Sequence, residues 1–286
     1  LEKILDFLVI LTVLAVLNFV LVNPALADQY PPRSGTLAWW HFDEGSGCTT
    51  SDVSGNANDG TLEPNCDINC PTWVGSMQGL DETLDYDGTD DYVNFGSDPS
   101  LKPSTEMTVE AWFKFDNTTT ENPIYSNWDG NGANSLVELK LNSDGKLEGH
   151  ISQSDHTVIG GEFTPVTIET GMWYHVALVA DSMGELSLYI NGSKVASTYM
   201  YDATFNDDAT NDFYTGRTGA GTDYGEGLID ELRILDRPLS QGEIQDDYQE
   251  GHKSTVPEFT LLTIGLAFVL AGGIYFWIRK RKQKTT

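Results

Sequence analysis

Residues 107–115 read M-T-V-E-A-W-F-K-F, a stretch in which apolar residues alternate with polar or small ones. A period of two is typical of a strand that is buried on one face. Residues 228–235 read L-I-D-E-L-R-I-L and alternate in the same way. Residues 173–180 read W-Y-H-V-A-L-V-A, which is nearly all apolar and predicts a central strand. These stretches predict an all-β domain.

Turn signals join the predicted strands into antiparallel hairpins. Asp144-Gly145 lies between strands predicted at 136–141 and 146–151. Such dipeptides favour tight hairpin turns. Further strands are predicted at 36–42 and 92–95, and at 186–190 and 194–197 on either side of Asn191-Gly192. Many short strands separated by turn residues indicate a two-sheet antiparallel jelly-roll sandwich.

One short helix is predicted near the C-terminal end of this domain. Ser240 and Glu243 form a capping box, Ile244 and Tyr248 follow on one face, and Gly251 is placed to end the helix. We therefore expect a single domain over residues 36–251, preceded by an N-terminal extension at 28–35.

Two apolar runs lie outside this domain. Residues 7–22 are followed by Asn23-Pro24 and Ala25-Leu26-Ala27, which predicts a signal peptide over residues 1–27; an uncleaved anchor is the alternative. Residues 259–278 hold no charged residue, and about 20 such residues cross a bilayer as a helix. Beyond this predicted transmembrane helix, the basic residues of 279–286 are expected to stay in the cytoplasm. The domain is therefore expected outside the cell, at the cell surface and anchored to the membrane.

The domain is strongly acidic. The whole chain has 43 acidic and 16 basic residues. Without Glu2, Asp6, Lys3 and the five basic residues of the tail, 41 acidic and 10 basic residues remain, a net charge of −31. Nucleic-acid binding needs clustered Lys and Arg, so we expect no nucleic-acid partner. An acidic surface attracts cations and keeps a protein soluble in salt, and the composition favours the second role over a ligand-binding one.

The cysteines are Cys48, Cys66 and Cys70. Disulfides persist outside the cell. Because Cys66 and Cys70 flank a short loop, they are the preferred pair, and pairing of Cys48 with either one is the alternative. A zinc site is not expected, because neither a second Cys pair nor a nearby His accompanies them.

Several segments, in order, resemble the LamG-like jelly-roll domains of the concanavalin A-like lectin/glucanase superfamily. They are residues 40–47 (W-H-F-D-E-G-S-G), 52–60 (D-V-S-G-N-A-N-D-G), 86–93 (Y-D-G-T-D-D-Y-V), 107–112, 173–177, 188–192 (L-Y-I-N-G) and 227–234 (G-L-I-D-E-L-R-I), with Leu239-Ser240 and Glu243-Ile244 after them. The resemblance covers about residues 36–250. It implies a concanavalin A-like fold with a carbohydrate-binding or glycoprotein-binding role.

The C-terminal end has a resemblance of its own. Residues 256–260 read V-P-E-F-T and precede the apolar run and the basic end. This arrangement resembles the PEF-CTERM sorting signal of archaeal surface proteins. It implies that the linker at 252–258 carries a sorting motif, that an archaeosortase-type enzyme processes the chain, and that the host is an archaeon.

A calcium site is predicted in the loop that holds Asp52, Asn56, Asn58 and Asp59. Ca²⁺ takes six to eight oxygen ligands from carboxylates and carbonyls. The family resemblance adds Asp230 of the last strand, where a structural Ca²⁺ would tie the two ends of the domain together. The alternative is that Asp and Asn serve here only as turn formers.

Two loops combine aromatic rings with hydrogen-bonding groups, as sugar sites do. The candidate ligand-binding residues are Trp128, Asp129 and Asn131 in the first loop, and Tyr201, Asp208 and Asn211 in the second. The alternative is that both loops are solvated turns with an aromatic plug. Asn117 and Asn191 begin N-glycosylation sequons, and Asn191 also has a role in a tight hairpin.

No catalytic residues are predicted. Retaining glycosidases hold two carboxylates about 5 Å apart. Asp230 and Glu231 are the nearest acidic pair on a strand, and neighbouring strand residues point to opposite faces. The sequence thus predicts a surface-anchored, lectin-like module that binds extracellular glycans or glycoproteins in adhesion or envelope architecture. A purely structural envelope protein is the alternative, and a glycoside hydrolase is favoured less.

Overall fold

We describe the protein from a computed structural model, which covers residues 32–66, 69–75, 82–163, 166–199 and 204–251. The predicted signal peptide (1–27), the sorting motif, the transmembrane helix (259–278) and the basic tail lie outside these residues. Within the described part, no helix combines the length and apolar character that a membrane crossing requires.

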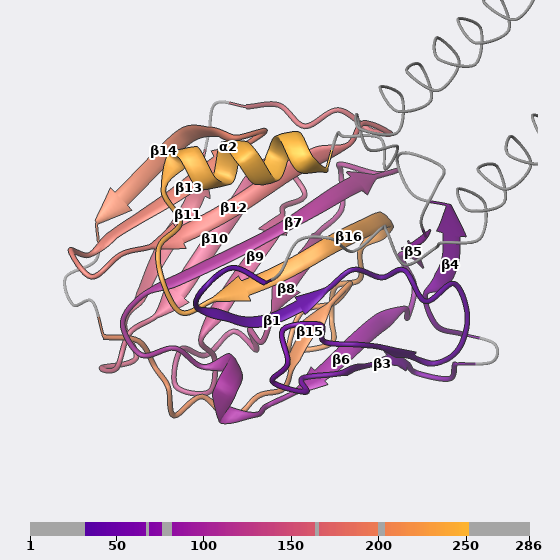
Figure 1. The fold of residues 1–286 in the computed structure, drawn as a ribbon, viewed down its shortest axis with the longest axis horizontal. Helices are drawn as coiled ribbons and strands as arrows, with labels where there is room; N and C mark the ends of the chain where they lie inside the picture. The colour runs from indigo at the N-terminus through magenta and orange to yellow at the C-terminus, as the bar shows by residue number, and fades with distance from the viewer. Residues whose placement is uncertain (1–31, 67–68, 76–81, 164–165, 200–203, 252–286) are drawn as a thin grey trace, which may run out of the picture. The chain divides into compact units, whose positions relative to one another are not determined.

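Two antiparallel sheets form a sandwich, which confirms the all-β prediction (Figure 1). The first sheet has the order β14 (Ser193–Tyr199), β13 (Glu185–Ile190), β12 (Tyr174–Ala180), β7 (Met107–Phe115), β16 (Glu226–Leu235), β5 (Glu82–Asp87) and β4 (Thr72–Gly75), with β1 (Thr36–Trp40) paired to β16. The second has the order β11 (Val158–Phe163), β10 (Leu147–Ser152), β9 (Val137–Leu141), β8 (Asn122–Ser126), β15 (Phe213–Thr215), β6 (Tyr92–Gly96), β3 (Gly60–Glu63) and β2 (Thr49–Thr50). A short 3-10 helix, η2 (Pro99–Leu101), precedes β7.

The core follows from the alternation that the sequence shows. In β7, Val109, Ala111 and Phe113 are fully buried in the core cluster between the sheets. In β9, Val137 and Leu139 belong to the same cluster. Since side chains alternate along a strand, Glu138 and Lys140 lie on the outer face of the second sheet.

The helix α2 (Gln241–Glu250) covers part of the outer face of the first sheet, where Figure 1 shows it lying across the strand layer. Its predicted capping box is present, since Ser240 accepts from the Glu243 N–H and the Glu243 side chain accepts from the Ser240 N–H. Ile244 packs in a cluster with Ala177 and Tyr189 of the sheet. The sequence prediction of one short C-terminal helix is confirmed.

A buried ionic network links α2 to the sheet and to the N-terminal extension. Asp247 lies 2.7 Å from Arg233 and 2.6 Å from Arg33, and Arg233 also pairs with Glu110. Burial raises the pKa of Glu110, but the Arg233 charge and the His175 imidazole, 3.6 Å from the carboxylate, outweigh burial and lower it to about 2. Charged groups that are this deeply buried need such partners.

The disulfide corrects the preferred pairing of Cys66 with Cys70. Cys48 and Cys66 are joined, with their Cα atoms 5.3 Å apart. The cause is strand pairing, because the Leu62 N–H donates to the Cys48 carbonyl and so holds Cys48 beside the end of β3. The Cys70 thiol instead donates to the Cys66 carbonyl at 2.8 Å.

Candidate functional site

The two loops predicted to bind sugar lie side by side at one end of the sandwich. The Asn206 amide donates to the carbonyls of Gly132, Ala133 and Ser135, at 2.8–3.1 Å. The Asn211 N–H donates to the Asn134 carbonyl. Segments that are distant in sequence are therefore locked into one loop cluster.

Asp129 is the polar centre of this cluster. Its carboxylate accepts hydrogen bonds from the Asn131 N–H and from the side chains of Asn134 and Ser135. Burial raises the pKa of Asp129, but these bonds and one from the Asn211 side chain outweigh burial and lower it. Asp129 is therefore a negatively charged acceptor, and the structure brings Asn211 of the second loop beside it, which the sequence did not predict.

The other predicted ligand residues are less closely connected to this cluster. Asp208 is exposed on the second loop, two positions before Thr210, whose N–H donates to the Asn134 carbonyl. Tyr201 lies outside the described residues, so its role in ligand binding stays a prediction.

Trp128 extends the cluster onto the outer face of the second sheet. Its indole stacks on the His150 imidazole, with ring centroids 5.7 Å apart and planes at 24°. The backbone N–H of Trp128 donates to the Ser126 hydroxyl, and the Trp128 carbonyl accepts from the Ala220 N–H. The indole is half-buried, so the backbone fixes its position while part of the ring remains accessible to a ligand.

A row of side chains crosses the outer face at this position. Tyr214 of β15 lies opposite Ser126 of β8. Ser126 lies opposite Glu138 of β9, which in turn lies opposite His150 of β10. Opposite residues of neighbouring antiparallel strands point to the same face. Tyr214, Glu138 and His150 therefore share one face with Trp128.

Charged residues gather around Glu138. Its side chain is 1% exposed, and Oε2 lies 3.3 Å from Lys140 Nζ and 3.4 Å from His150 Nδ1. Lys140 also contacts Glu121 and Glu148, at 3.1 and 3.7 Å. Burial lowers the pKa of Lys140, but the charges of these three carboxylates outweigh burial and raise it. Glu138 Oε1 is buried and has no hydrogen-bond partner among the described residues.

The sequence interpretation missed this charged group. The signal that predicts it is the alternation in residues 137–141, V-E-L-K-L, and 147–151, L-E-G-H-I, where charged residues occupy the outward positions. Which strands stand next to each other, and hence which charges meet, depends on the sheet order.

Arg217 forms a second feature of the same face. Its guanidinium carbon lies 4.3 Å from the Tyr92 ring centroid and 4.0 Å from that of Tyr214, and Tyr92 lies edge-on to Tyr214. Burial raises the pKa of both phenols, and the Arg217 charge lowers it in part. A cation held between aromatic faces is stabilised by about 0.5–2 kcal/mol per contact.

The predicted calcium loop forms a hydrogen-bonded hub. Both oxygens of Asp52 are engaged: Oδ1 accepts from the N–H groups of Trp39 and Ser54, and Oδ2 accepts from the Ser54 hydroxyl and the Asn58 N–H. Asp59 accepts from the Asp52 N–H. Hydrogen bonds from protein N–H and O–H groups therefore fix the conformation of this loop.

The amides of this loop are also engaged with protein atoms. Asn56 and Asn58 both donate their side-chain N–H groups to the Leu37 carbonyl, and Asn58 Oδ1 accepts from the Ser100 hydroxyl. Among the described residues, Asp52, Asp59 and Asp230 do not form a group of carboxylates within 4.8 Å. This geometry does not favour Ca²⁺ at the predicted set, and calcium binding stays a prediction.

A β-bulge corrects the argument that Asp230 and Glu231 point to opposite faces. The register with β7 shifts between Asp230 and Arg233, and Glu231 adopts φ 52°. Glu231 therefore bonds to Trp39 and His41 on the outer face of the first sheet. Asp230 lies opposite Trp112, whose ring stacks against Tyr248 of α2 on that same face. A bulge breaks strict alternation because it adds one residue to one strand.

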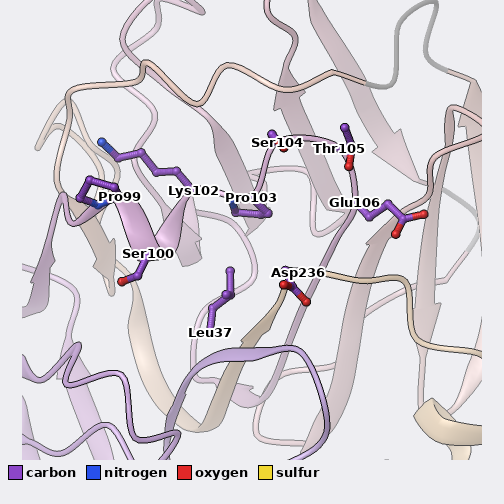
Figure 2. A pocket seen from close by; sticks show the side chains of 9 residues that line it. All are labelled: Leu37, Pro99, Ser100, Lys102, Pro103, Ser104, Thr105, Glu106 and Asp236. Atoms are coloured by element: carbon purple, nitrogen blue, oxygen red, sulfur yellow. The ribbon is translucent and has the colours of Figure 1, made fainter.

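Two further features are an acidic turn and a groove. Asp87, Asp90 and Asp91 bring carboxylate oxygens within 4.8 Å of one another in the β5–β6 turn, where they mainly accept N–H groups such as those of Asp87 and Thr89. A groove of about 390 Å³ lies beside η2. Figure 2 shows its charged ends, Lys102 and Glu106, turned away from each other, and its lining holds no aromatic ring.

The two sequons differ in their surroundings. Asn117 is half-buried in the loop after β7, and its Oδ1 accepts from the N–H and hydroxyl of Thr119. Asn191 has φ 49° and accepts from the His175 N–H, and a Cβ at the adjacent Gly192 would lie 2.9 Å from Gln245 of α2. Glycosylation stays a prediction at both positions, and Asn117 has the more open surroundings.

Comparison with known proteins agrees with the fold. The sequence profile of a family described as the concanavalin A-like lectin/glucanases superfamily matches residues 87–245, more than half of the chain. No protein of curated function matches the chain.

Solved structures show the same architecture. Domain 4 of AbnA, a GH43 extracellular arabinanase from Geobacillus stearothermophilus, in complex with arabinotriose, is 23% identical with a TM-score of 0.58 over 74% of this chain and 97% of that one. The binding domain of Paraclostridial Mosquitocidal Protein 1 is 15% identical with a TM-score of 0.57, over 78% of this chain and 52% of that one. The botulinum neurotoxin serotype D binding domain is 15% identical with a TM-score of 0.52, over 75% and 51%. The chain thus spans about half the length of the toxin domains.

Proposed function

Because this chain belongs to the concanavalin A-like lectin/glucanases superfamily, we propose that it is a non-catalytic module that binds an oligosaccharide on the outer face of its second sheet. The observation that carries the proposal is the Trp128–His150 stack beside Glu138. A fold alone does not fix a function, so the proposal depends on this site.

The chemistry of the site suits a sugar. Aromatic rings offer apolar faces to the C–H groups of a sugar, while a few polar groups fix its orientation. Glu138 is buried and holds Lys140 at 3.3 Å and His150 at 3.4 Å. The Lys140 and His150 side chains are 15% and 19% exposed, so they are the groups beside Trp128 that a sugar hydroxyl can reach. Asp129, Asn131 and Asn211 supply further hydrogen-bonding groups at the loop end of the same surface.

The location of the module is part of the proposal. The apolar run at 259–278, the basic residues after it and the V-P-E-F-T motif support a membrane-anchored ectodomain outside the cell, processed by an archaeosortase-type enzyme. Protease added to intact cells should remove the domain. Protection of the domain inside the cell would contradict this location.

Glycan binding is tested with the full-length protein on a glycan array. Trp128→Ala should abolish binding without unfolding the protein. The matched control is Trp173→Ala, because Trp173 lies beside Lys114 of the first sheet and away from the site. Binding lost equally in both variants, or kept in Trp128→Ala, would contradict the assignment.

Two other functions have distinct outcomes in the same experiments. A purely structural envelope protein would bind no glycan on the array. A glycoside hydrolase would release reducing sugar from a β-glucan, and the Glu138 variant Glu138→Gln would abolish that release.

A further inference from the structure

Arg217 differs from the other described arginines in its partners. Arg33 and Arg233 both pair with Asp247, and Arg237 pairs with Glu243 at 2.8 Å. In the part of the chain that the structure describes, no carboxylate lies within 4.0 Å of Arg217. The chain has 43 acidic residues against 16 basic ones, so an arginine without a carboxylate partner is unusual here.

The surroundings of Arg217 hold its half-buried side chain in place. Nε donates to the Thr218 carbonyl at 3.2 Å, and the rings of Tyr92 and Tyr214 lie against the guanidinium. Gly221 lies against the guanidinium: a Cβ there would be 3.4, 3.5 and 3.6 Å from Cζ, Nη2 and Nη1. Because position 221 is glycine, only backbone approaches the guanidinium from that side.

Arg217 also lies on the surface proposed to bind sugar. It stacks on Tyr214, and Tyr214 begins the row that runs through Ser126 and Glu138 to His150. Three strand spacings separate Tyr214 from His150, about 14 Å at ~4.8 Å per spacing. Ser126 and Glu138 are buried between the two ends, so an oligosaccharide that rests on Trp128 would pass over them to reach Arg217.

We propose that Arg217 binds an acidic group, a carboxylate or a sulfate, of the sugar chain that occupies this face. The proposal rests on the glycan-binding function and specifies its ligand class. A guanidinium binds such groups through two parallel, charge-assisted hydrogen bonds. The net charge of −27 acts against an anion at long range, but the Debye length is about 8 Å at physiological salt, so the direct contact decides binding.

The experiment uses the full-length protein on an array that carries each acidic glycan beside its neutral counterpart. One pair is oligogalacturonate and its methyl ester, which tests a carboxylate. The other is dextran sulfate and dextran, which tests a sulfate. Arg217→Gln should weaken binding of the acidic member about tenfold to hundredfold and leave the neutral member unchanged.

Two further variants complete the test. Arg217→Lys keeps the charge but loses the two-nitrogen fork, and an intermediate loss is expected. It also carries the test if Arg217→Gln does not fold. Arg237→Gln is the matched control, since Arg237 pairs with Glu243 beside α2, and it should bind every glycan as the wild type does.

The outcomes separate this inference from the proposed function. Glycan binding with no preference for the acidic members, or a preference that survives Arg217→Gln, overturns the role of Arg217 and leaves glycan binding in place. Wild-type protein that binds no glycan on the array overturns both.

Discussion

Trp128 and His150 stack with their ring centroids 5.7 Å apart, although one belongs to a loop and the other to the outward face of β10. The contact joins the loop cluster around Asp129 to the charged group around Glu138. One surface thereby combines an aromatic platform with buried hydrogen-bonding groups, which neither the loop nor the sheet provides alone.

The stack predicts that His150 positions Trp128. His150→Ala should weaken glycan binding by up to about tenfold, because an aromatic pair contributes about 0.5–1.5 kcal/mol. His150→Phe keeps the ring and should restore most of this loss. Titration calorimetry measures both variants. Equal losses in the two would mean that the imidazole nitrogens, rather than the stack, matter for binding.

The hub at Asp52 predicts a structural role that does not depend on calcium. Asp52→Ala removes the acceptor of four hydrogen bonds and should destabilise the protein by about 3 kcal/mol in urea denaturation. We expect the same loss in excess chelator and in excess Ca²⁺. A loss that is clearly larger in Ca²⁺, together with a higher melting temperature of the reloaded wild type, would instead support the calcium site predicted from the sequence.

The β5–β6 turn predicts a pH dependence of stability. Burial and the charges of Asp87 and Asp90 raise the pKa of Asp91 from 3.8 to about 6. The native state thus holds more protons than the unfolded state between these values, so this group makes stability fall as pH rises from about 4 to about 6.

Asp91→Asn keeps an acceptor for the Asp87 N–H and removes the titration. Its melting temperature relative to wild type should therefore increase over this range and then level off. Thermal melts in chelator, which exclude a bound cation, provide the measurement. A constant difference from pH 4 to 7 would contradict the raised pKa.

The network below α2 predicts unequal costs for two arginines. Arg233→Met leaves Glu110 buried without its cation and should cost about 3–5 kcal/mol. Arg237→Met breaks a half-exposed pair with Glu243 and should cost about 1 kcal/mol or less. Urea denaturation compares the two. Similar losses would show that the buried network contributes no more than a surface pair.

Most strands were predictable because each has a strong local pattern. β7 was expected at residues 107–115 and occupies Met107–Phe115. β9 and β10 differ from their predicted spans by one or two residues at the ends. The capping box at Ser240 and Glu243 was predictable for the same reason, since it involves residues only three positions apart.

Features that depend on long-range pairing were not predictable from the same patterns. The short strands β2 and β3 lack clear alternation, and their pairing sets the Cys48–Cys66 disulfide in place of the expected Cys66–Cys70. The bulge at Glu231 requires a left-handed backbone conformation that nothing in L-I-D-E-L-R-I-L indicates. Both depend on neighbours that are remote in sequence.

The candidate site also combines local features that the sequence predicted with long-range contacts that it did not. The amino-acid sequence by itself determined most of the strands, the acidic surface and the two polar loops, because hydrophobic periodicity and turn chemistry act between residues that are close along the chain. Only the tertiary structure decided that Trp128 lies on His150, that Glu138 is buried beside Lys140, and that Arg217 lies between two tyrosines. Sheet order and register bring these side chains together, and they are set by packing over the whole domain.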